Sequence, residues 1–101
     1  MRFMLKFTVP VESGNETLRD PEFGPKLRQL LADMQAEAAY FCTINGRRGG
    51  YIVVNFDDAS RIAGFAEPFF YWLKAEVEYI PVMLGEDLAR ADVEGVIKKW
   101  G

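Results

Sequence analysis

The sequence predicts an α+β domain in which helices cover one face of a four-stranded antiparallel sheet. One observation is a run of β-branched and aromatic residues, Tyr51 to Phe56, that leads directly into an apolar helical pattern. A second is the alternation of apolar and polar side chains from Arg2 to Val9, which is typical of a strand with one buried face. A third is a pair of strand-like runs on either side of a glycine-rich turn, which indicates a hairpin. Together these features favour one layer of sheet packed on one layer of helices.

The N-terminal half predicts one strand and one helix. Arg2 to Val9 is the strand, and Pro10 ends it because its ring nitrogen has no hydrogen to donate to a neighbouring strand. We expect the polar segment Val11 to Arg19 to form a loop. Asp20-Pro21 resembles a helix N-cap followed by proline at the first helical position, and the helix should end near Gln35. Apolar residues recur along it at helical spacing: Phe23, Leu27, Leu30, Leu31 and Met34.

The C-terminal half predicts three strands, a glycine-rich turn and two helices. In chain order they are the strand Glu37–Ile44, the turn Asn45–Gly50, the strand Tyr51–Phe56, a helix from near Asp58 to Leu73, the strand Glu76–Val82 and a final helix capped by Asp92. We expect Pro68 to break or kink the first of these helices, and Glu86 to Arg90 to form a short turn. The order β-α-β-β-α-β with a C-terminal helix is the ferredoxin-like arrangement, in one domain over residues 1–101.

Composition limits the classes of function. The chain has 101 residues, of which 50% are hydrophobic, and its net charge of −3 argues against a surface for nucleic acid or anionic membranes. No apolar run reaches the roughly 20 residues that cross a bilayer. The N-terminus is too strand-like for a signal peptide, and Cys42 has no second cysteine to pair with, so we expect a cytoplasmic protein. We also expect Cys42 to be buried in its strand as a small apolar group.

The chain contains no histidine. This excludes histidine general-base catalysis, Ser-His triads, and metals or haem held by histidine. No carboxylate spacing matches a calcium loop. The sequence therefore predicts neither a metal nor a cofactor, and it identifies no catalytic residue. We interpret Arg47 and Arg48 as solvated residues of the hairpin turn, because the glycines around them do not lead into a helix as they do in a phosphate loop.

One face of the predicted sheet has no helix to cover it. It should carry several large apolar side chains among polar ones, and an exposed patch of that kind marks an interface or a binding groove. We therefore expect a homodimer, with room for larger assemblies of dimers, in which two such faces enclose a cavity for a small apolar ligand. The candidate cavity residues are Lys6, Tyr40, Tyr51, Asn55 and Glu78.

Two interpretations stay open for these candidates. Lys6 and Glu78 should be neighbours on adjacent strands, either as a proton-transfer pair or, as we favour, as a structural ion pair. Tyr40, Tyr51 and Asn55 can hydrogen-bond a ligand. They can equally bond to one another or across the dimer, which is the interpretation we favour.

Four segments resemble a family of small, uncharacterised bacterial proteins: PVESGN (Pro10–Asn15), EAAYF (Glu37–Phe41), AEPFF (Ala66–Phe70) and PVMLGEDL (Pro81–Leu88). The resemblance extends over nearly the whole chain. It implies a dimeric α+β barrel, a group that includes antibiotic-biosynthesis-type monooxygenases and muconolactone isomerases. It implies a fold and a cavity but no particular reaction, because this scaffold serves many functions.

Two functions from different classes are consistent with the sequence. The preferred one is a homodimeric small-molecule-binding or assembly module with a cavity on the sheet face. The alternative is a cofactor-independent monooxygenase or isomerase that acts on a small aromatic or lactone-like substrate. The alternative requires Lys6, Glu78 or a tyrosine to be turned into a pocket of sufficient size.

Overall fold

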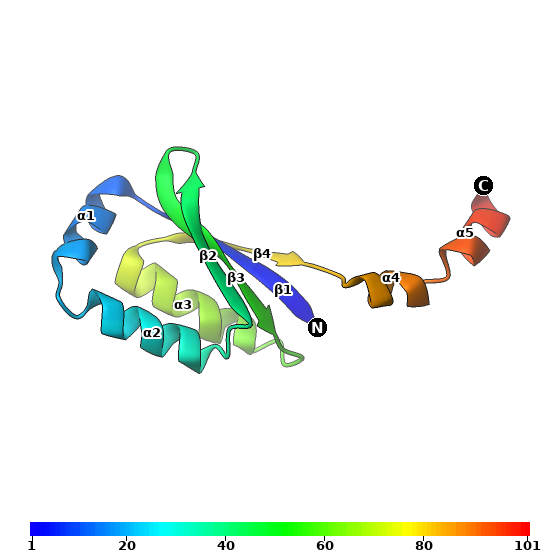
Figure 1. Cartoon of the computed structure of the whole chain (residues 1–101), viewed down its shortest axis with the longest axis horizontal. Coiled ribbons are helices and arrows are strands. Elements are labelled where there is room, and N and C mark those ends of the chain that lie inside the picture. Colours follow the sequence, from blue (N-terminus) through cyan, green and yellow to red (C-terminus); the bar gives the residue numbers. More distant parts are fainter.

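The computed structural model describes residues 1–101 as an α+β fold with a four-stranded antiparallel sheet (Figure 1). The strands are β1 (Arg2–Val9), β2 (Ala38–Ile44), β3 (Arg47–Asn55) and β4 (Glu76–Pro81). The helices are α1 (Val11–Arg19), α2 (Phe23–Asp33), α3 (Arg61–Leu73), α4 (Gly85–Arg90) and α5 (Val93–Trp100). The strands lie in the order β2-β3-β1-β4, which is compatible with the ferredoxin-like arrangement that the sequence predicts. β1 has the predicted bounds.

The hydrophobic core lies between one face of the sheet and the helices α2 and α3. Leu5 of β1, Ile52 of β3 and Phe69 of α3 have no exposed surface, and Met34, which follows α2, is 2% exposed. The rings of Phe7 and Phe69 lie 5.0 Å apart, so the sheet and α3 are in direct aromatic contact. Each such side chain contributes roughly 1.5–3 kcal/mol by leaving water. The buried residues of β1 alternate with more exposed ones, as a strand with one covered face requires.

The segment Val11 to Arg19 is the helix α1, and the prediction of a loop was wrong. Pro10 precedes it with extended dihedrals (φ −55°, ψ 141°), and the Thr17 hydroxyl donates a 2.8 Å hydrogen bond to the Ser13 carbonyl. Gly14 is buried against the sheet, where its lack of a side chain allows close packing. Gly14 and Asn15 lower intrinsic helix propensity, but packing decides the conformation here.

The helix α2 is shorter than predicted at both ends. The Asp20 carboxylate accepts a 2.9 Å hydrogen bond from the Glu22 backbone N–H, and the Asp20 carbonyl accepts one from Phe23. Asp20 therefore stabilises a turn ahead of the helix. At the other end, Gln35 has a left-handed φ of 51°, which stops the helix after Asp33.

The hairpin between β2 and β3 has a tighter turn than predicted. Its two turn residues, Asn45 and Gly46, have φ values of 51° and 78°, the combination that a two-residue type I′ turn requires. The strand β3 therefore starts at Arg47, and Gly49 and Gly50 lie inside it. A Cβ on either glycine would collide with a carbonyl oxygen of the neighbouring strand, so these glycines permit close strand packing.

Of the break or kink expected at Pro68, the break does not occur, because α3 runs unbroken from Arg61 to Leu73. The residue four positions earlier, Gly64, is exposed and has no side chain, so water can reach the carbonyl that Pro68 leaves without a helical partner. The helix ends at Lys74, which has a left-handed φ of 53°.

The C-terminal arm, which we define as residues 83–101, extends away from the rest of the molecule (Figure 1). The predicted turn Glu86–Arg90 is the short helix α4, and the predicted cap of α5 is confirmed because the Asp92 carboxylate accepts a hydrogen bond from Gly95. No residue of α4 or α5 is buried. The arm raises the radius of gyration to 16.9 Å, against about 13 Å for a compact domain of this length. No helix combines the length and apolar character needed to cross a membrane.

The side chain of Tyr79 provides a pH-dependent test of how β4 packs on α3. Its hydroxyl donates a 2.8 Å hydrogen bond to the Ile62 carbonyl, and burial raises its pKa from 10.0 to about 12. Tyr79→Phe should lower the free energy of unfolding by about 1 kcal/mol at pH 8. Since the folded state favours the neutral phenol, the contribution of Tyr79 is complete below its unfolded pKa and is lost as the pH rises toward 12. Urea titrations of both proteins at several alkaline pH values measure this difference, and a difference independent of pH would contradict it.

Two glycine-to-alanine substitutions should have opposite effects. Gly46→Ala should lower the free energy of unfolding by about 1 kcal/mol, because a Cβ is disfavoured at positive φ. Gly64→Ala should raise it by about 0.5–1 kcal/mol, because the site is helical and no atom lies within 4 Å of the added carbon. Urea denaturation of the two variants measures both changes, and effects of the same sign would overturn the turn assignment.

Candidate functional site

Four of the five candidate residues form one row across the open face, by which we mean the sheet face that no helix covers. Tyr40 of β2 pairs with Tyr51 of β3, Tyr51 pairs with Lys6 of β1, and Lys6 pairs with Glu78 of β4. Each strand therefore contributes one side chain to the row. Because side chains alternate between faces, the Tyr40 side of β2 lies on this face, as expected from the sequence.

Asn55 does not belong to this row. It lies at the end of β3, where it pairs with Arg2, and its amide oxygen accepts a 3.0 Å hydrogen bond from the Met1 amino group. Nearby, the Arg2 guanidinium donates to both carboxylate oxygens of Glu37 at 2.9–3.2 Å. These hydrogen bonds hold the pKa of Glu37 below its ordinary value and raise that of Arg2. Asn55 thus lies in a network that connects the strand ends.

Lys6 and Glu78 form an ion pair of the kind found on surfaces. The Lys6 Nζ lies 3.8 Å from Glu78 Oε2, which is beyond hydrogen-bond distance, and the Glu78 side chain is 67% exposed. Water and the length of the two side chains reduce the energy of such a pair to about 0–1 kcal/mol. The geometry agrees with the structural interpretation of the pair.

The open face of one chain carries two small recesses, of about 240 Å³ and 270 Å³, both below the roughly 300 Å³ at which typical ligand pockets begin. The first is lined mainly by polar and charged side chains, and Lys6 and Glu78 contribute to it, whereas Tyr40 and Tyr51 do not. A larger cavity on this face requires a second molecule to cover it.

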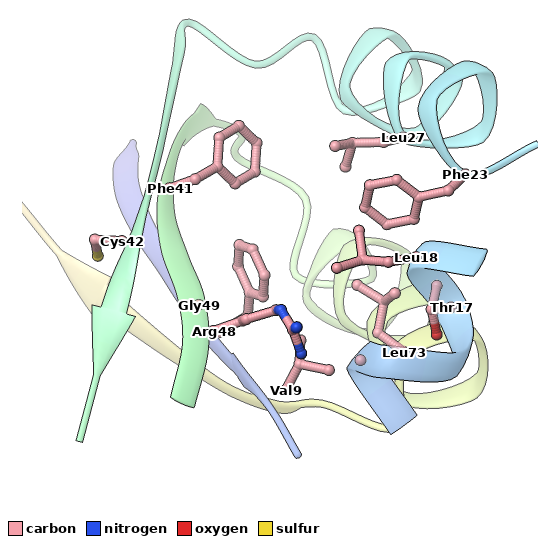
Figure 2. A pocket seen from close by; sticks show the side chains of 12 residues that line it. Val9, Thr17, Leu18, Phe23, Leu27, Phe41, Cys42, Arg48, Gly49 and Leu73 are labelled. Carbon is pink, nitrogen blue, oxygen red and sulfur yellow. The ribbon is translucent and has the colours of Figure 1, made fainter. Parts of the chain in front are cut away.

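Cys42 is exposed, and the prediction that it is buried was wrong. It lies on the open face of β2, an edge strand, so no element packs against it. Figure 2 shows its sulfur directed away from the space between the sheet and the helices. No group of three or more Cys, Asp or Glu side chains converges to hold a metal ion.

A mainly apolar hollow lies on the other side of the sheet, between β2, α1 and α2 (Figure 2). We call it the helix-side cavity, and its volume is about 500 Å³. Its walls are mainly apolar and include Phe7, Val9, Leu18, Phe23, Leu27, Phe41 and Leu73, with Cys42 at the edge on β2. Phe41 is 56% exposed and Leu18 is 49% exposed, so the cavity is open to solvent along this side.

Aromatic packing forms the edges of this space. On the helix-facing side of the sheet, Gly50 lies between Phe41 and Phe7, and the Phe7 ring packs over it, 3.0 Å from where a Cβ would be. At the start of α2, Phe23 packs against Trp72 of α3, with ring centroids 5.5 Å apart. The first turn of α2 is therefore in contact with α3.

Arg48 is the only charged side chain that lines the helix-side cavity. Its Nη2 donates a 2.9 Å hydrogen bond to Asn15 Oδ1, and its Nη1 donates a 3.4 Å bond to the Val11 carbonyl. A Cβ on Gly14 would lie 2.9 Å from Arg48 Nη1, so the glycine leaves room for the guanidinium. Arg48 is exposed, as expected, but it lies in β3 and not in the turn, and its side chain bonds to α1.

Sequence reasoning missed this cavity because it treated α1 as a loop. The available signal was the helical spacing of Val11, Gly14 and Leu18 directly after a proline. With α1 in place, Leu18 and Thr17 become cavity residues.

Neither a scan against protein-family models nor a search of curated proteins found a match to this chain.

Proposed function

We propose that this protein is a homodimeric small-molecule-binding module of the dimeric α+β barrel type, in which two copies pack their open faces together. The observation that carries the proposal is the open face itself. It presents Tyr40, which is 61% exposed, beside four partly exposed residues, Tyr51, Met4, Val53 and Ile80. Aromatic and large apolar groups of this kind are enriched at protein interfaces.

The amount of exposed surface supports association. The chain exposes 7060 Å², whereas a compact monomer of this mass exposes about 5800 Å². A standard interface buries about 800 Å² on each partner, so the excess is large enough for a stable dimer. The open face also carries both signs of charge, at Lys6 and Glu78, and can face its own copy without a net repulsion.

In this dimer the ligand site is the space between the two sheets. The recess beside Lys6 and Glu78 would be closed by the second copy, and Tyr40 and Tyr51 would border it. Phenol hydroxyls and an ion pair beside the apolar side chains of Met4, Val53 and Ile80 suit a small apolar ligand with few polar groups.

The C-terminal arm gives a second surface for the same partner. Val93, Val96, Ile97 and Trp100 recur at helical spacing and form one apolar stripe on α5. Trp100 is 78% exposed and Ile97 is 61% exposed, because the arm extends beyond its own core. We expect this stripe to pack on the second copy of the dimer.

Replacing a tyrosine on the open face should separate the dimer. Tyr40→Glu puts a charge into the proposed interface, and its matched control is Tyr71→Glu, at an 84% exposed tyrosine on α3. We expect light scattering at low micromolar concentration to give twice the chain mass of 11.5 kDa for the wild type and for Tyr71→Glu, and the single mass for Tyr40→Glu. A monomeric wild type would contradict the proposal. A dimeric Tyr40→Glu variant would show that the dimer interface does not lie on the open face. Native mass spectrometry of the wild type tests for a retained small molecule.

Removing the indole of Trp100 should weaken the dimer without abolishing it. Trp100→Ala should raise the dimer dissociation constant about thirtyfold, the effect of losing an aromatic anchor worth about 2 kcal/mol. The neighbouring Lys99→Ala is the control and should leave it nearly unchanged. Sedimentation equilibrium measures both constants, and equal constants for the two variants would exclude the arm from the interface.

A further inference from the structure

We propose that the helix-side cavity is a second binding site, selective for small apolar carboxylates, with Arg48 as the counter-ion. This site lies on the opposite face of the sheet from the proposed dimer interface. The proposal of this second site therefore does not depend on the proposed dimer.

The shape and walls of the cavity suit a small organic molecule. Its volume of about 500 Å³ lies within the roughly 300–1,000 Å³ of ligand pockets. In Figure 2, Phe23 and Leu27 from α2 face Phe41 from β2 across the space. The ring of Phe7 forms part of the lining, 6.4 Å from that of Phe41. Flat or branched carbon groups of the ligand would contact these rings.

The positive charge of Arg48 determines which polar group a ligand of this cavity should carry. Arg48 brings one positive charge, and no carboxylate of the chain lies within ion-pair distance of it. Its two hydrogen-bond acceptors, on Asn15 and Val11, are both neutral. A guanidinium has five N–H donors arranged to hold a carboxylate through two parallel bonds, so Arg48 keeps donors for an incoming anion. The rest of the cavity has no charged group to compete for it.

The C-terminal arm of a second copy fits this cavity less well than a free carboxylate does. Its apolar stripe ends at Ile97 and Trp100, and Lys98 and Lys99 lie between them in the sequence. Inserting that end of the arm would bring two lysines toward the positive charge of Arg48, with an unfavourable interaction between like charges. Charge complementarity therefore favours a free acid.

The test uses three probes that share one carbon skeleton: 3-phenylpropanoate, the neutral 3-phenylpropanamide and the cationic 3-phenylpropylamine. Isothermal titration calorimetry on the chain of 101 residues should show saturable binding of the carboxylate, at least about tenfold weaker binding of the amide, and the weakest binding for the amine. Equal affinity for carboxylate and amide would overturn the proposal, as would the absence of saturable carboxylate binding.

Variants connect the selectivity to Arg48. Arg48→Met keeps the apolar stem and should remove the preference for carboxylate over amide, whereas Arg47→Met, one residue away on the other face of β3, should preserve it. Gly14→Ala keeps the charge but pushes the guanidinium aside, and should weaken carboxylate binding several-fold with a smaller effect on the amide. Unchanged selectivity in Arg48→Met would overturn the assignment.

Two further variants separate this site from the dimer. Tyr40→Glu should retain carboxylate binding because the mutation lies on the open face. Loss of binding in that variant, with its fold intact by circular dichroism, would place the ligand between the sheets instead. Carboxylate binding that appears only in Trp100→Ala would identify the arm as the natural occupant of the cavity and would also overturn the proposal.

Discussion

The pairing of β1 with both β3 and β4 is the constraint on which the rest of the structure depends. Hydrogen bonds on both sides fix the strand, and its side chains must then alternate between the two faces of the sheet. Leu5 and Phe7 enter the core, so Lys6 and Thr8 must lie on the open face. The same register aligns Lys6 with Tyr51 and Glu78. One strand thus determines both what the helices cover and what they leave exposed.

The hollows on the two faces of the sheet differ in the polarity of the side chains that line them. On the open face, Ile44 packs over Gly49, and the recess beside Lys6 and Glu78 is polar because these two side chains border it. On the helix side, the Arg48 guanidinium occupies the space beside Gly14 and the Phe7 ring lies over Gly50, and the cavity walls are mainly apolar. The chemistry of each hollow therefore follows from the side chains that line it.

The fold was more predictable from the sequence than the cavity was. The alternation in β1 and the stop at Pro10 are local signals, and so is the capping of α5 by Asp92; these elements were confirmed. The loop predicted for α1 was wrong because packing overrode weak helix formers. Of the break or kink expected at Pro68, the break does not occur, because an exposed glycine accommodates the proline.

The helix-side cavity depends on how residues far apart in the sequence meet. Phe41 and Leu27 line it from opposite sides, and Phe23, which also lines it, packs on Trp72 of α3. Neither periodicity nor composition carries that information. The row Tyr40–Tyr51–Lys6–Glu78, by contrast, follows from strand order and alternation alone, which is why sequence reasoning could assemble it.

The C-terminal arm bears on how many molecules the proposed assembly of this chain contains. An arm that reaches from one molecule to the next can pass the contact along without end, which would produce a filament, unless the second molecule returns its own arm to the first. A two-fold pairing of open faces would orient both molecules so that the two arms are exchanged reciprocally. Pairing of the open faces would then limit the assembly to two molecules. A molecule whose open face was blocked but whose arm remained free would lose that limit and would add further copies through its arm.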